Sequence, residues 1–159
     1  QGVRREVTQL QHDCGADGRA VPPANFHVTL AFLGMQDTGV IPAVCDIAST
    51  LSFEPCEVRL DRLGSFRRAG VLWLGASAVP EPLAAFQHDL VGALLEAGIG
   101  YDRKPWKLHL TLYRKLRTMP PTMDSVEVRW RLQGFSLVES VSFNRGVVYH
   151  DIASWKARR

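Results

Sequence analysis

This sequence has few cysteines, no long apolar run and no linker or low-complexity tract, and each of these shortages excludes a class of protein. The three cysteines form neither a paired framework nor a metal-ligand spacing, which indicates reduced thiols in a cytoplasmic protein. No apolar run approaches the roughly 20 residues that span a membrane, and residues 1–17 are too polar for a signal peptide. No linker or low-complexity tract divides the sequence, so we expect a single domain over residues 1–159 that acts as a monomer.

The composition that is present is that of a soluble globular domain with a mildly basic charge. Hydrophobic residues make up 46% of the chain and charged residues 22%, and the net charge is +3. A charge of this size permits a polyanionic partner such as RNA without requiring one.

One four-residue pattern occurs twice. His27 and Thr29 in the segment 26–34 are separated by one apolar residue, and so are His109 and Thr111 in the segment 107–115. A β-strand alternates its faces, so each segment sends its His and Thr to one face and its apolar pair to the other. The repeat predicts a bipartite active site. A purely structural duplication is the alternative.

Two histidines suit proton transfer to and from an oxygen. An imidazole has an ordinary pKa of about 6.5, so one ring can be neutral and take a proton while the other is charged and gives one. Each such role contributes about 10²–10⁴ in rate. The nearby threonine hydroxyls can donate to non-bridging phosphate oxygens. No acidic cluster for Mg²⁺ and no Cys or Ser nucleophile motif accompanies them, which favours phosphoryl transfer without metal or other cofactor. The remaining histidines, outside any repeated motif, are interpreted as surface or structural: His12, His88 and His150.

One further residue beyond each motif is a candidate for substrate binding. Arg114 lies five residues after His109, so a regular strand sends it to the opposite face, and it reaches the phosphate only if the strand ends or bulges. Otherwise it is a solvated charge. Phe32 has the same offset from His27; it either stacks on a base or packs in the core.

The order of elements predicts an α+β fold. Helices are expected within 3–10, 40–51 and 81–97, and a turn over 64–70. Strands are expected at 26–34, 56–63, 71–75, 107–115, 125–133, 135–143 and 146–151. This order favours antiparallel sheets in two lobes, which would face each other across the histidine strands.

The blocks around the two motifs resemble the 2H phosphoesterase superfamily, which is defined by paired His-x-Thr-x motifs. Within it they are similar to the RNA 2′,3′-cyclic phosphodiesterases, also called the bacterial 2′-5′ RNA ligases. The resemblance covers nearly the whole chain and rests on five blocks: residues 21–34, 63–66, 71–75, 109–115 and 135–140.

The resemblance implies a bilobal fold of two antiparallel sheets, with helices outside and a central cleft. His27 would be the general acid on the leaving O3′, and His109 the general base that activates water, giving a 2′-phosphate. Thr29 and Thr111 would hold the phosphate together with Arg114. The family also opens with a strand of the type Arg-x-Phe-x-Ala, which this sequence lacks, so we expect a missing N-terminal strand and an exposed sheet edge.

Two other functions stay open at this point. The same histidines could join RNA halves by 2′-5′ ligation, with a 5′-hydroxyl in place of water. A non-catalytic RNA-binding module is the third possibility. It would use the basic side chains outside the motifs: Arg67, Arg68, Arg103, Lys104, Lys107 and Lys115.

Overall fold

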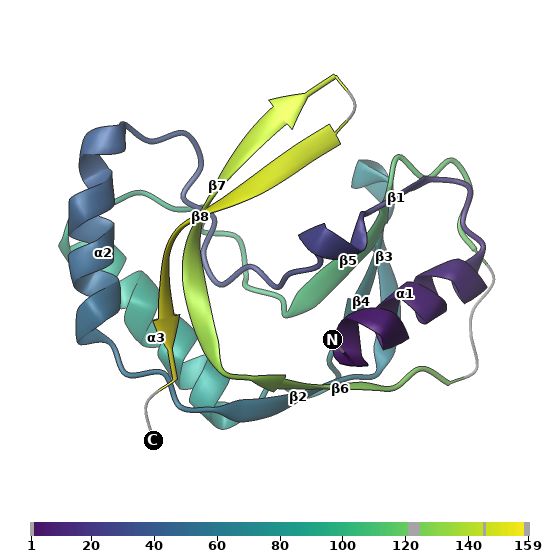
Figure 1. Ribbon diagram of the computed structural model, residues 1–159, viewed down its shortest axis with the longest axis horizontal. Helices are drawn as coiled ribbons and strands as arrows, with labels where there is room; N and C mark the ends of the chain where they lie inside the picture. The colour runs from purple at the N-terminus through teal and green to yellow at the C-terminus, as the bar shows by residue number, and fades with distance from the viewer. Residues whose placement is uncertain (1, 121–124, 145, 158–159) are drawn as a thin grey trace. The chain divides into compact units, whose positions relative to one another are not determined.

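The computed structural model describes residues 2–120, 125–144 and 146–157 (Figure 1). Its chain divides into two compact units, each made of three segments. Unit 1 comprises Gln1–Thr29, Glu57–Val79 and Lys107–Trp130. Unit 2 comprises Leu30–Cys56, Pro80–Trp106 and Arg131–Arg159.

The three predicted helices are confirmed. They are α1 (Gly2–Cys14), α2 (Ile41–Thr50) and α3 (Glu81–Glu96). Helix α3 illustrates why the pattern was readable: a proline lies in its first turn, and its buried side chains recur at helical spacing. Gly98, with a φ of 71°, follows the end of this helix in the left-handed conformation that glycine tolerates best.

Unit 1 contains a four-stranded antiparallel sheet in the order β1–β5–β4–β3. Its strands are β1 (Arg19–Ala20), β3 (Arg62–Phe66), β4 (Val71–Gly75) and β5 (His109–Arg114). Helix α1 lies across one face of the sheet (Figure 1). The buried Gln11 amide donates to the carbonyls of Val21 and Leu112, and the Tyr113 hydroxyl donates to the carbonyl of Gln11. These bonds fix α1 to β5 and leave the other face of the sheet for other groups.

Three sequence predictions about unit 1 are wrong. The expected strand over 56–63 is divided, because one strand ends at Leu60 and β3 begins at Arg62. The expected strand over 26–34 is not a regular strand: its one ladder contact is an isolated antiparallel bridge between Val28 and Leu110. A short 3-10 helix, η1 (Pro23–Asn25), precedes it and interrupts pairing along β5. The expected turn over 64–70 is also displaced, because β3 continues to Phe66 and the reversal is made by η3 (Arg67–Ala69).

Unit 2 is built on a long hairpin of β7 (Gly134–Phe143) and β8 (Gly146–Lys156) with α2 and α3. Strand β8 is longer than the predicted 146–151. An aromatic cluster joins these elements, with ring centroids 4.7–6.0 Å apart: Phe53, Phe86, Phe135 and Trp155. The remaining strands, β2 (Cys56–Leu60) and β6 (Val128–Leu132), pair with each other. The α+β class with antiparallel sheets is thus confirmed.

Candidate active site

Both histidine motifs lie on the same face of the unit 1 sheet. The antiparallel bridge pairs Val28 with Leu110. Extending this register by one residue in each direction sets His27 opposite Thr111 and Thr29 opposite His109. Side chains in directly opposed positions have Cβ atoms about 4.5–5.5 Å apart. By this extension each histidine lies across from the threonine of the other motif, on the face that α1 does not cover.

The two imidazoles are anchored by the same local hydrogen bond. Nδ1 of His27 lies 2.7 Å from the carbonyl oxygen of Asn25, and Nδ1 of His109 lies 2.7 Å from that of Lys107. Because a carbonyl oxygen only accepts, Nδ1 carries the hydrogen in both rings. Nε2 is then the nitrogen of each ring that is left to accept a proton.

His109 lies in an aromatic and cationic environment. Its ring meets Phe66 edge-on at 5.2 Å and Trp73 at 6.3 Å between centroids. The Lys107 ammonium is held over the Trp73 ring, 4.1 Å from its centroid. Burial is the main cause that lowers the pKa of His109; the bond to the Lys107 carbonyl opposes it, and the charges of His27, Lys107 and Arg114 lower the pKa further. The lowered pKa favours the neutral form of His109, which is the form that can accept a proton.

Glycines on two strands make room for Trp73. The indole lies against Gly64 so closely that a Cβ there would overlap its six-membered ring. A Cβ on Gly75 would lie 2.8 Å from the same ring and 2.9 Å from the Leu108 carbonyl. The sequence motifs did not identify Trp73, Phe66 or Lys107 as neighbours of His109. The one available signal was the pair of glycine-containing blocks that the family resemblance had already marked.

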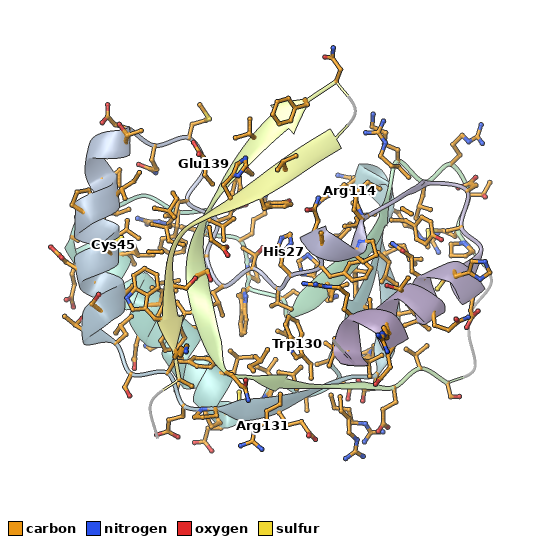
Figure 2. The ribbon with its side chains drawn as sticks, in the orientation of Figure 1. His27, Cys45, Arg114, Trp130, Arg131 and Glu139 are labelled. Atoms are coloured by element: carbon orange, nitrogen blue, oxygen red, sulfur yellow. The ribbon has the colours of Figure 1, made fainter. Side chains whose placement is uncertain are left out.

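A β-bulge decides on which face Arg114 lies. Leu72 pairs with Tyr113 but Trp73 pairs with Thr111, so Leu112 is an extra residue in β5. Leu112 and Tyr113 are consequently both buried, and Tyr113 faces α1. The alternation restarts after the bulge and returns Arg114 to the face of His109 and Thr111, consistent with its effect on the pKa of His109. Figure 2 labels Arg114 and His27, which lie on β5 and on the segment after η1.

The sixth predicted residue, Phe32, belongs to unit 2. Phe32 is 61% exposed, so it is not a core residue, and its carbonyl accepts a hydrogen bond from the Asp102 N–H. The predicted role of Phe32 in stacking a base stays a prediction.

The described residues contain neither a metal-ligand cluster nor a membrane-spanning helix. Across residues 2–120, 125–144 and 146–157, no three His, Cys, Asp or Glu side chains are grouped as metal ligands would be. Within the same ranges, every helix is too short or too polar to cross a bilayer.

Comparison with known proteins identifies the class first. The family model described as LigT like Phosphoesterase matches residues 1–73. The crystal structure of Escherichia coli LigT complexed with 3′-AMP superposes with a TM-score of 0.82 at 27% identity, covering 99% of this chain and 92% of that one.

Named relatives narrow this class. An RNA 2′,3′-cyclic phosphodiesterase of Archaeoglobus fulgidus is 28% identical, over 94% of this chain and 91% of its own length. The Escherichia coli (strain K12) protein of the same name is 31% identical, over 81% of this chain and 73% of its own length. The chain belongs to the LigT-like phosphoesterase family, as the two histidine motifs had predicted.

Proposed function

We propose that this protein hydrolyses 2′,3′-cyclic phosphates at RNA ends to 2′-phosphates, with His27 as general acid, His109 as general base and no metal ion. The names of its relatives support the reaction. The observation that carries the mechanism is the Val28–Leu110 bridge, because its register gathers both His-Thr pairs on one face of one unit. We also expect the protein to act as a monomer in the cytoplasm.

The reaction is an in-line displacement at phosphorus. Nε2 of neutral His109 takes a proton from water as the water oxygen forms a bond to phosphorus. The bond between phosphorus and O3′ breaks, and O3′ receives the proton of the His27 imidazolium. The products are a 2′-phosphate and a 3′-hydroxyl, and the two histidines exchange protons with solvent before the next turnover.

The remaining site residues would hold the substrate. The hydroxyls of Thr29 and Thr111 donate to the non-bridging phosphate oxygens, whose charge increases in the transition state. Arg114 supplies a permanent positive charge on the same face. Phe32 would stack on the terminal base. These roles use only hydrogen bonds and charge, so chelators should leave turnover unchanged.

The test is end-group analysis of an oligonucleotide that carries a 2′,3′-cyclic phosphate. His27→Ala and His109→Ala should each lose about 10²–10⁴ in kcat, while His88→Ala, an exposed histidine on α3, serves as the matched control. Full activity in either motif variant would overturn the mechanism. A second RNA half with a 5′-hydroxyl should be included, since predominant 2′-5′ joining would assign the same residues to ligation. If the wild-type protein binds the RNA but does not hydrolyse the cyclic phosphate, it acts as a binding module instead.

A further inference from the structure

A group of exposed cations lies where β1, β5 and η3 meet in unit 1. We call the side chains of Arg19, Arg67, Arg68, Arg114 and Lys115 the basic rim; all five are exposed. Three loops are tied together here. The Leu116 N–H donates to the Gly70 carbonyl over 3.0 Å, and Gly18 packs so closely on the Arg114 carbonyl that a Cβ would lie 2.6 Å from it. The rim is therefore a fixed surface rather than a set of independent tails.

The rim carries positive charge that no neighbouring carboxylate balances. Within the described part of the chain, none of the five rim cations takes part in an ion pair. The nearby Asp17 is already engaged: it accepts from the backbone N–H groups of Arg117 and Thr118, and lies 3.9 Å from the Arg117 guanidinium. This aspartate braces the loop without neutralising the rim.

Two features of the rim are unfavourable for the isolated fold. Arg19 and Arg114 are direct cross-strand partners, and like charges in such positions repel. Lys115 has a φ of 57°, the left-handed conformation that a lysine adopts only at a cost. A polyanion across the rim offsets the first feature, because a phosphate between the arginines turns repulsion into shared attraction. The strain at Lys115 remains, but it holds a further cation beside the two arginines.

We infer that the basic rim binds the phosphates of the nucleotides that precede the terminal cyclic phosphate of a single-stranded RNA. The inference rests on the proposed function and extends it from the reacting phosphate to the body of the substrate. Arg114 connects the two, because the bulge sets it on the histidine face while its cross-strand partner Arg19 belongs to the rim. Arg67, Arg68 and Lys115 then contact phosphates farther along the chain.

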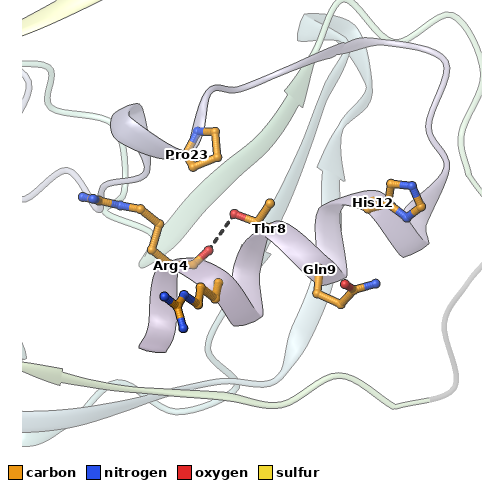
Figure 3. Close-up of a pocket in the computed structure, with 6 residues that line it drawn as sticks. Arg4, Thr8, Gln9, His12 and Pro23 are labelled. Atoms are coloured by element: carbon orange, nitrogen blue, oxygen red, sulfur yellow. Dashed lines mark hydrogen bonds between the residues drawn. The ribbon is translucent and has the colours of Figure 1, made fainter. Parts of the chain in front are cut away.

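A second basic surface in unit 1 provides the control. A pocket on α1 is lined by Arg4, Arg5, Thr8, Gln9, His12 and Pro23 (Figure 3). Its polar side chains are used within the helix, since the Thr8 hydroxyl donates to the Arg4 carbonyl and the Gln9 amide to Asp13. It has two neighbouring arginines, as the rim does, but lacks the opposed like charges and the left-handed lysine.

The experiment compares two substrates and two paired variants. Wild type, Arg67→Gln/Arg68→Gln and Arg4→Gln/Arg5→Gln are assayed on 2′,3′-cyclic AMP and on a single-stranded oligonucleotide with a 2′,3′-cyclic phosphate. The rim pair should raise KM for the oligonucleotide about tenfold and lower the slope of log affinity against log salt by about 1.4, since each single-strand phosphate contact contributes about 0.7. Hydrolysis of 2′,3′-cyclic AMP should stay within twofold of wild type, and the α1 pair should behave as wild type on both substrates.

Binding of a 3′-phosphorylated oligonucleotide, measured by fluorescence anisotropy, separates this inference from the proposed function. If wild type does not hydrolyse the cyclic phosphate but its binding of the oligonucleotide depends on the rim arginines, the proposed reaction is wrong and the inference about the rim is kept. The inference about the rim is wrong if the two arginine pairs raise KM for the oligonucleotide equally. It is also wrong if the rim pair impairs hydrolysis of both substrates equally.

Lys115→Gly supplies a readout that a purely structural role would not give. Glycine relieves the left-handed φ, so this variant should unfold at higher denaturant while binding the oligonucleotide more weakly. If stability and binding fall together, or if binding is unchanged, the inference is wrong.

Discussion

The two histidine motifs share a sequence pattern but not a structural setting. The second lies inside β5, a strand with partners on both sides, where aromatic rings and Lys107 surround its histidine. The first follows a 3-10 helix and contacts β5 through one bridge. The same four residues thus occur once in a regular strand and once in an irregular segment.

The difference teaches that a repeated motif need not place its histidines in equivalent surroundings. Burial at β5 favours the neutral form of His109, because a charged imidazole loses hydration there. The identical Nδ1 anchors give both rings the same tautomer, so the two rings differ in their neighbourhood and not in their hydrogen bond to the backbone. We expect that difference to separate the proposed acid from the proposed base.

The largest effect is expected from removing the two histidines one at a time and following activity against pH. A base must be neutral and an acid charged, so wild type should give a bell-shaped profile. His109→Ala should lose the limb that rises with pH, and His27→Ala the limb that falls at higher pH, each on a background reduced about 10²–10⁴-fold. Profiles of kcat/KM between pH 5 and 9 measure both.

Loss of the same limb in both variants would show that the motifs are equivalent after all. The double variant adds a check. Because the two groups are proposed to act in one transition state, its fold reduction in kcat/KM should be well below the product of the two single reductions.

An intermediate effect is expected from filling the space beside Trp73. Gly64→Ala places a methyl group in the indole ring and should lower the free energy of unfolding by about 1–3 kcal/mol. Urea denaturation measures this change. The matched control is Gly92→Ala on α3, where a Cβ meets nothing within 4 Å and the better helix propensity of alanine should add about 1 kcal/mol. If Gly64→Ala is as stable as wild type, the indole of Trp73 packs on Gly64 less tightly than the contact distances indicate.

The smallest effect is expected from Lys107→Met. Methionine keeps an apolar chain against the indole but removes a positive charge that lowers the pKa of His109, so that pKa should rise. The limb of the activity profile that rises with pH then moves to higher pH. Burial, the larger cause, is unchanged, so the pKa should stay below its ordinary value. Titration of the imidazole by NMR measures the shift, with Lys104→Met as control; a fall in the His109 pKa would contradict the assignment.

Much of the fold could be predicted where local sequence and tertiary contacts agree. Helix α3 has its proline, its apolar stripe and its terminal glycine in the expected places, and β4 matches the predicted 71–75. The strand over 26–34 was wrong because alternation alone does not supply a pairing partner: η1 diverts the chain, and Val28 pairs only once.

The candidate site divides in the same way. Alternation within each motif predicts that its His and Thr share a face, but the bridge that brings His27 and Thr29 beside His109 and Thr111 is visible only in the structure. The glycine at position 64 suggested a turn, whereas its actual cause is the indole that lies on it from another strand. The position of Arg114 depended on an extra residue in β5, which only pairing with β4 reveals.

The bulge at Leu112 shifts the alternation of β5 by one residue. Upstream of it, odd-numbered residues share the histidine face; downstream, even-numbered residues do. Deleting Leu112 would remove the extra residue, so Tyr113 would follow Thr111 in regular alternation and Arg114 would keep its face. A single insertion or deletion at a regular position of the strand would instead exchange the faces of the residues that follow it. Redesign of this enzyme family by insertion or deletion near the second motif must therefore conserve the phase of the strand as well as its residues.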